Sequence, residues 1–482
     1  MINSEVNITD FPELEEVPEP RQELPSIKVN GIAKISSQSR DFGVQVSINN
    51  KIFRLRYPTG LWSRFPKTHR NILAQNLTYS LTYHIPYLYP TLKKVFYNMP
   101  VPLSEAFLFK SLSLSLPSVA LMQTQKDKKL TSNLLRRLFE IDYIFTNKKT
   151  EIPPYNRTSL SDHVIMPFTF GKDSLLTYSL ASELGLKVYP VYISEPDYPY
   201  QELIKKVLSN PFRKEFKEKI YFLQNNMGIL REPYGWFGWE LQLTQYSLML
   251  LPYVYAKKAG YILFSNEQSC DDYITDVDGF RCNPIFEQSH SWLLQNSLMT
   301  SIIGGNSLSI GSLIEPLHEI AIMKILHHRY PEIGKYQSSC DMDYKPKSNG
   351  RWCETCSKCG RMYIFLQGLG ISSKKLGFKH NLLSKKYRNL YGILDNRSLK
   401  NFGYDQSEAG RDEQIFAFHL AYKRGVKGPL ITEFVKKYIK YATKNEKSFR
   451  RRFFGIHSNK TVPSPFKAKL LRIYHQELDH LT

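Results

Sequence analysis

The sequence lacks two features that a membrane or secreted protein would show. It has no apolar run of the roughly 20 residues needed to span a bilayer, and no signal-peptide pattern at its start. Cysteine is also scarce: there are six, and four of them are bunched between positions 340 and 359. That distribution is unlike the disulfide framework of secreted domains. We therefore expect a soluble, cytoplasmic protein without membrane contact.

Acidic side chains are the other shortage, because 65 Lys and Arg outnumber 44 Asp and Glu, for a net charge of +21. Such an excess favours polyanionic partners such as RNA or nucleotides, although a merely basic solvated surface would give the same balance. The 482 residues are enough for two or three domains. A hydrophobic content of 42% indicates a globular chain.

Composition and periodicity divide the chain into five parts. A Pro-rich acidic segment at 1–26 predicts a disordered tail, and 27–150 reads as a small α+β domain that binds a substrate or partner, or covers the next domain. The α/β domain is expected at 159–335 and a metal-binding segment at 336–373. The last part, 374–482, is helical in pattern and basic, with Arg450 to Arg452 as its most concentrated charge.

The stretch from His163 to Ile193 is the most informative. An apolar run ending at Phe170 predicts a strand, leucines at helical spacing after Ser174 predict a helix that Gly185 ends, and 187–193 predicts a second strand. A βαβ unit of this length implies a parallel sheet whose ligand site lies at the loop leaving the first strand. Residues 198–230 are expected to be helical, and 261–264 to form a third strand.

The loop of this unit reads Thr169-Phe170-Gly171-Lys172-Asp173-Ser174. A Gly before a helix start lets backbone N–H groups approach an anion, and the helix dipole adds positive potential there. Lys172 offers a cation, Ser174 a hydroxyl, and we expect Lys172 and Asp173 to face solvent. The spacing differs from the GxxxxGK[ST] nucleotide loop. The alternative is an ordinary tight turn into a helix.

Polar residues follow the third strand, where a parallel sheet would point them into the ligand crevice. Glu267, Asp271 and Asp272 are therefore candidates for substrate or Mg²⁺ contacts, since Mg²⁺ is commonly held by one or two carboxylates plus ligand phosphates. Arg281 is a candidate partner for a carboxylate or phosphate. A solvated acidic loop would have the same composition.

The four bunched cysteines are Cys340, Cys353, Cys356 and Cys359. Two-residue spacings let successive thiolates converge on one ion, and Cys340 can complete a tetrahedron. The set suits a structural Zn²⁺ site, and an iron–sulfur cluster is the alternative that spacing does not separate.

Together these motifs carry a family resemblance. The loop resembles the SGGxDS signature of the PP-loop ATP pyrophosphatases, with Thr169 for the first Ser and Phe170 for the first Gly. Glu315-Pro316-Leu317 and Lys324 lie between this loop and the cysteine motif. The whole arrangement, over about 160–370, resembles the 7-cyano-7-deazaguanine synthases, which are much shorter and have no counterpart of the N-terminal domain.

The resemblance implies a Rossmann-like α/β PP-loop ATPase domain that binds ATP through residues 169 and 171–174. Lys172 and Asp173 would be the catalytic residues of an adenylating enzyme that cleaves ATP to AMP and pyrophosphate. Its substrate would be a small-molecule carboxylate or a nucleobase. Two alternatives are a non-catalytic nucleic-acid-binding protein on the same fold and a tRNA-modifying adenylating enzyme.

Overall fold

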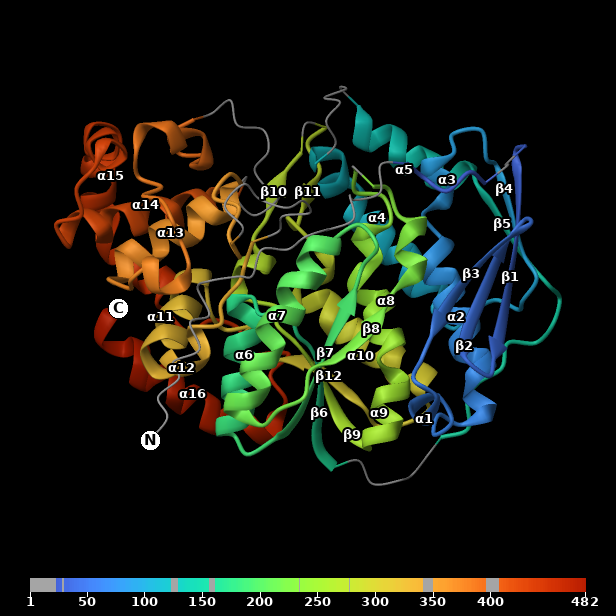
Figure 1. Ribbon diagram of the computed structural model, residues 1–482. Helices are drawn as coiled ribbons and strands as arrows, with labels where there is room; N and C mark the ends of the chain where they lie inside the picture. Colours follow the sequence, from blue (N-terminus) through green and yellow to red (C-terminus); the bar gives the residue numbers. More distant parts are fainter. Residues whose placement is uncertain are drawn as a thin grey trace.

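The computed structural model describes residues 23–27, 30–122, 129–155, 161–233, 235–276, 278–340, 350–395 and 407–482. Two five-stranded sheets organise these residues, and helices lie between the sheets and beyond the second one (Figure 1). The acidic tail expected at 1–26 lies almost entirely outside the described residues.

The central sheet is parallel throughout, as the sequence predicts. Its strand order is β12-β9-β6-β7-β8. The chain therefore enters in the middle at β6, moves to one edge, and returns to build the other half, which is a doubly wound topology. The order reverses between β6 and β9, and such a switch point is where α/β folds place their ligand crevice. The strands are β6 (Ser161–Pro167), β7 (Lys187–Ser194), β8 (Tyr221–Gln224), β9 (Ala259–Phe264) and β12 (Ser309–Ser312).

Both faces of this sheet are buried, which explains why its strands read as nearly continuous apolar runs. In β6, Val164 and Met166 enter one hydrophobic core and Ile165 enters the other, all three fully buried. The first core extends into the C-terminal helices, and the second extends into the N-terminal domain. The sheet is thus held between the two parts of the chain that flank it in sequence.

The predicted βαβ unit is confirmed, with helix α6 (Lys172–Glu183) between β6 and β7. Gly185 ends the helix in the left-handed region, at φ +82°. The helix expected over 198–230 is wrong in its second half: α7 (Pro199–Phe216) ends at Lys217, and β8 follows. This strand has only four residues, so it gives little periodicity, and its pairing with β7 determines its structure.

The N-terminal domain has a mixed sheet in the order β3-β2-β1-β4-β5, in which β1, β4 and β5 run parallel. The sequence predicts short strands at 27–29, 43–48 and 51–57, the last two joined by a hairpin turn, and β2 and β3 confirm that hairpin. The first strand was expected at 27–29 and lies instead at 32–40, because its second half is polar and shows no apolar alternation. The strands are β1 (Ile32–Arg40), β2 (Gly43–Ile48), β3 (Lys51–Arg56), β4 (Lys94–Tyr97) and β5 (Asp142–Phe145).

Helices from both domains form the layer between the sheets (Figure 1). Helix α2 (Lys67–Thr82) packs against β1 on one side and against α8 (Gln242–Met249) and α10 (His290–Gly304) on the other. Four further helices are α1 (Thr59–Trp62), α3 (Ile85–Leu88), α5 (Leu130–Glu140) and α9 (Leu251–Lys257).

Helix α4 (Glu105–Met122) is the one described helix that is long and apolar enough to cross a membrane. Half of that window is buried inside the protein, and the core helix of a folded domain passes the same test. It packs against α5 and α10, so its apolar character is explained by the core that it joins.

The C-terminal helices cover the opposite face of the central sheet (Figure 1). Residues of the expected basic region, such as Phe416, Phe453 and Leu470, are fully buried in the same core as β6. The helices are α11 (Glu319–Arg329), α12 (Pro331–Gly334), α13 (Ser357–Leu369), α14 (Glu408–Lys423), α15 (Pro429–Phe453) and α16 (Ser464–Leu478).

Candidate functional site

The loop from Thr169 to Ser174 leaves β6 at the switch point of the central sheet and leads into α6. Phe170, which stands where the family signature has its first Gly, adopts φ +57°, the left-handed region that a Gly occupies freely. A non-Gly residue pays about 1–2 kcal/mol for this conformation. Its fully buried ring packs against Phe168 and Phe212, which offsets that cost.

The start of α6 presents backbone donors. The Ser174 hydroxyl accepts from the Thr169 N–H at 3.3 Å and donates to the Gly171 carbonyl at 3.2 Å, which closes the loop on itself. Among the described residues, the N–H groups of Asp173 and Ser174 have no acceptor. Free N–H groups at a helix N-terminus attract an anion.

The Lys172 side chain does not face solvent, and that expectation is wrong. It is 1% exposed, and its Nζ lies 2.5 Å from Asp173 Oδ1, 3.1 Å from Glu267 Oε2 and 3.2 Å from Glu319 Oε1. Asp173 keeps 31% of its side chain exposed, and is thus the accessible member of the group. Lys172 therefore acts in this structure as the cation that holds three carboxylates together.

The charges in this group are set by burial and by one another. Burial lowers the pKa of Lys172, but the carboxylates of Asp173, Glu267 and Glu319 outweigh it and raise that pKa well above its usual value. For Glu319, burial is outweighed by Arg361, whose Nε lies 2.9 Å away, and by Lys172, so its pKa is lowered. Glu267 differs, because burial dominates and raises its pKa.

The other polar candidates after β9 do not join this group. Asp271 accepts from the backbone N–H and ring Nδ1 of His290, at 2.9 and 2.8 Å. Asp272 lies 3.5 Å from Arg452 on α15, and Arg281 is exposed, with its guanidinium 3.9 Å from the centre of the Tyr273 ring.

Among the described residues, these carboxylates form no group that could hold a metal ion. Glu267 shares Lys172 with two other carboxylates, whereas Asp271 and Asp272 pair with His290 and Arg452. A site of one or two carboxylates completed by ligand phosphates, as expected for Glu267, Asp271 or Asp272, stays a prediction.

A short segment, Ser338-Ser339, joins the loop to the cysteine cluster. The Ser338 N–H donates to the Phe170 carbonyl at 2.7 Å, and the Lys172 N–H donates to Ser339 Oγ at 3.1 Å. The Lys205 ammonium donates to the Ser338 carbonyl at 2.8 Å. Cys340 follows directly, so whatever fixes Cys340 also fixes the loop.

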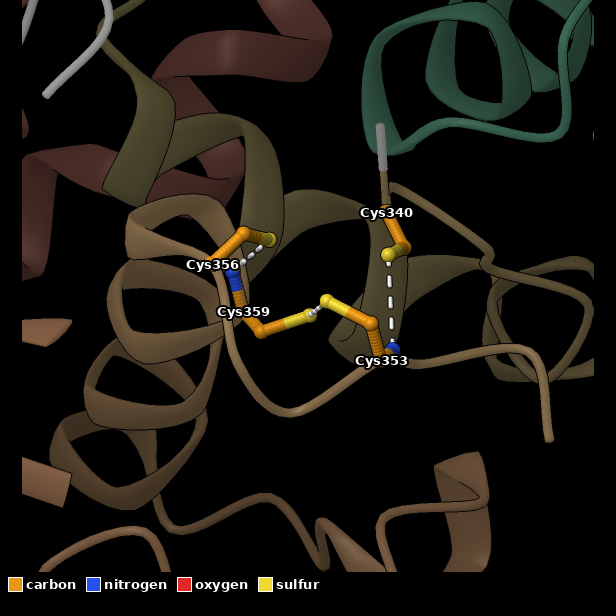
Figure 2. A group of neighbouring side chains, drawn as sticks. All are labelled: Cys340, Cys353, Cys356 and Cys359. Carbon is orange, nitrogen blue, oxygen red and sulfur yellow. Dashed lines mark hydrogen bonds between the residues drawn. The ribbon is translucent and has the colours of Figure 1, made fainter. Parts of the chain in front are cut away.

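The four cysteines converge, as the spacing predicts. The sulfur atoms of Cys340, Cys353, Cys356 and Cys359 all lie within 4.8 Å of one another, and none is in a disulfide. Figure 2 shows the sulfur atoms of Cys353 and Cys359 directed at each other, and they are 3.7 Å apart. A tetrahedral ion with metal–sulfur bonds of about 2.3 Å would place its sulfurs about 3.8 Å apart.

Backbone N–H groups support these sulfurs. Cys353 N–H donates to Cys340 Sγ, Thr355 N–H to Cys353 Sγ and Cys359 N–H to Cys356 Sγ, each at 3.4 Å. Such bonds stabilise thiolate rather than thiol, as a metal ligand requires. Hydrogen bonds from the neighbouring cysteines and Thr355 lower the pKa of Cys353, whereas hydrogen bonds within the cluster raise the pKa of Cys340 and burial raises that of Cys359. The donor set therefore fits a metal ion such as zinc.

Several residues at this edge of the sheet were missed from the sequence. Glu319 and Arg361 belong to no motif. Glu319 reaches the loop because α11 packs beside α6, and Arg361 reaches Glu319 because α13 packs beside α11. Glu315 is 2% exposed and accepts from the Thr461 N–H and hydroxyl, at 2.6 and 2.7 Å. The C-terminal region thus contributes to the rim of the site.

Comparison with known proteins adds no assignment: no protein-family model matches the chain, and a search of curated proteins finds no match.

Proposed function

We propose that the protein is an ATP-dependent adenylating enzyme of the PP-loop type, which cleaves ATP to AMP and pyrophosphate while activating a carboxylate or a nucleobase. The observation that carries the proposal is the position of the 169–174 loop. It joins a buried parallel strand to a helix N-terminus at the switch point of a doubly wound sheet. The left-handed backbone of Phe170 supports it further, because Gly, the residue at this position of the signature that the loop resembles, adopts that conformation most freely.

In the proposed reaction, a substrate oxygen attacks the α-phosphorus, and pyrophosphate leaves. The free N–H groups of Asp173 and Ser174 and the dipole of α6 stabilise the negative charge that develops on the phosphates. The buried Lys172 is enclosed by carboxylates, and its role is to hold Asp173 at the start of α6 through their ion pair. Asp173, the accessible carboxylate of the group, would hold a Mg²⁺ ion whose other ligands are phosphates of the nucleotide, and that ion would offset phosphate charge.

The cysteine cluster has a structural role in this proposal. We assign zinc to it, since four thiolates suit that ion. The role is structural because four protein ligands leave no open coordination position for a substrate. Its contribution is to fix Cys340 and thereby Ser338-Ser339, the segment that bonds to the loop at Phe170 and Lys172.

A second candidate is a nucleic-acid-binding protein on the same fold without catalysis. The net charge of +21 and the enclosure of Lys172 by carboxylates favour it, because that lysine cannot touch a phosphate in this conformation. A tRNA-modifying enzyme would combine both properties and would need RNA as its substrate.

Release of pyrophosphate from ATP, measured with a metabolite extract and separately with cellular RNA, tests the proposal. Asp173→Asn should lower release at least about 100-fold, since it removes the accessible carboxylate that would hold a nucleotide-bound Mg²⁺ ion at the loop. Asp162→Asn, which alters an exposed carboxylate on β6 of the same βαβ unit, should leave release unchanged.

Equal activity of the two variants would contradict the assignment of the loop. If pyrophosphate is released with neither the metabolite extract nor RNA, while RNA binding is retained, the non-catalytic candidate is favoured instead.

A further inference from the structure

The N-terminal sheet has a pocket of 360 Å³ at the carboxyl ends of its three parallel strands. Residues 37–40 of β1 line it, together with 98–100 after β4 and 148–149 after β5, and α2 contributes Asn71 and Gln75. Crevices outside the carboxyl ends of parallel strands are where α/β folds bind ligands. The volume is within the range of about 300–1,000 Å³ that small-molecule sites occupy.

The pocket forms because β1 is longer than its neighbour. β4 pairs with β1 only over Ile32 to Ile35, and the Asn98 N–H makes the last bond, to the Ile35 carbonyl at 2.8 Å. Beyond that point β1 pairs with β2 alone, and its sequence there is Ser-Ser-Gln-Ser-Arg. A polar strand edge therefore faces the pocket, which explains the polar residues that concealed β1 in the sequence.

The lining suits an anionic ligand that also forms hydrogen bonds. The lining contains three cationic side chains and one carboxylate: Arg40, Lys148, Lys149 and Glu151. The side-chain amides of Gln75 and Asn98 also line the pocket. Neither amide has a hydrogen-bond partner in the part of the chain that the structure describes.

The pocket continues onto the exposed face of the sheet. Gln38 accepts from Gln45 at 3.4 Å, and Gln45 accepts from Arg54 at 3.3 Å, so a polar row crosses three strands from the pocket to β3. On the same face, Lys34 is opposite Phe96 in the register of β1 and β4, and the Phe96 ring is 36% exposed. A cation beside an exposed aromatic ring is the usual pair of contacts in single-strand recognition.

We propose that this pocket and the adjoining sheet face bind a single strand of nucleic acid, with one nucleotide in the pocket. Arg40, Lys148 and Lys149 contact phosphates, the free amides of Gln75 and Asn98 contact the base or sugar, and Phe96 stacks on a neighbouring base. The net charge of +21 complements a phosphodiester backbone. The proposal does not depend on adenylation, because the site lies in the other sheet and its test contains no ATP.

The test is fluorescence anisotropy of the full chain with labelled oligonucleotides of about 12 nucleotides, one RNA and one DNA, at several salt concentrations. Replacing Arg40, Lys148 and Lys149 with Ala should weaken binding at least about tenfold. The slope of log K against log salt should fall by about 2, since each phosphate contact of a single strand contributes about 0.7. Phe96→Ala should weaken binding at least about fivefold.

The matched control replaces Lys374, Lys375 and Lys469 with Ala, which removes the same charge from exposed positions of the C-terminal region. It should bind within about twofold of the wild type if local contacts, rather than net charge, decide affinity. Saturable binding of RNA, DNA or both that the pocket variants lose supports the proposal, and a preference for RNA assigns a contact to the 2′-hydroxyl. Equal affinities of the pocket and control variants would overturn it, as would the absence of saturable binding by the wild type.

Discussion

Removing the charge of Lys172 should destabilise the whole fold, and not merely impair a surface site. We choose Lys172→Met, which keeps the length of the side chain and removes the ammonium. Its Nζ is within 3.2 Å of Glu267 and Glu319, and both carboxylates are buried. Glu319 keeps Arg361 at 2.9 Å, whereas Glu267 has no second cation in an ion pair among the residues that the structure describes.

The expected loss in the free energy of unfolding is about 3–5 kcal/mol, the usual cost of breaking a buried ion pair by removing one partner. Lys187→Ala is the matched control in the same βαβ unit. That lysine pairs with Glu218 at 3.1 Å, but its side chain is 53% exposed, so the loss should be at most about 1 kcal/mol. Guanidinium denaturation followed by tryptophan fluorescence gives both values.

A second substitution isolates the cause. Adding Glu267→Gln to Lys172→Met removes the unpaired carboxylate and should recover about 1–3 kcal/mol. The loss should also depend on pH. Without Lys172 the folded-state pKa of Glu267 is raised further above its unfolded value, so stability is retained at low pH and lost as the pH rises. The defect should therefore be larger at about pH 8 than at about pH 5. A Lys172→Met protein as stable as Lys187→Ala, at both pH values, would refute the reasoning.

Three further predictions concern the metal and the loop. Elemental analysis should find about one zinc per chain, whereas iron with a visible absorption band would assign a cluster instead. Cys353→Ser should lower the melting temperature and the zinc content, while Cys270→Ser, at a buried cysteine outside the cluster, should keep the zinc; retained zinc in Cys353→Ser would contradict the ligand set. Phe170→Ala should cost about 3–5 kcal/mol through lost packing. Phe170→Gly should cost about 1 kcal/mol less than Ala because of the left-handed backbone, and the reverse order in denaturation experiments would contradict that conformation.

The parts of the fold that the sequence predicts are those with strong local signals. The βαβ unit has long apolar strands and a leucine-spaced helix ended by Gly185, so neighbouring residues determine its structure. The convergence of the cysteines is likewise local for three of the four. Cys353 and Cys356 lie just before α13, and Cys359 lies in its first turn.

What the sequence does not predict depends on contacts between distant residues. Nothing near Lys172 indicates that Glu267 and Glu319, far along the chain, surround its ammonium. The short strand β8 and the polar end of β1 are determined by pairing rather than by their own pattern. The expectation that Lys172 faces solvent was wrong for this reason, because exposure is a property of the packed structure.

The proposed function requires that ATP is cleaved between its α- and β-phosphates. The most direct test incubates the full chain with ATP labelled at the α-phosphate, in the presence of a metabolite extract or of RNA, and separates the labelled nucleotides by chromatography. We predict that the label appears as AMP or in an adenylated acceptor, with pyrophosphate formed in equal amount, and that Asp173→Asn abolishes both. Label in ADP, with release of orthophosphate, would contradict the adenylation mechanism and the function built on it.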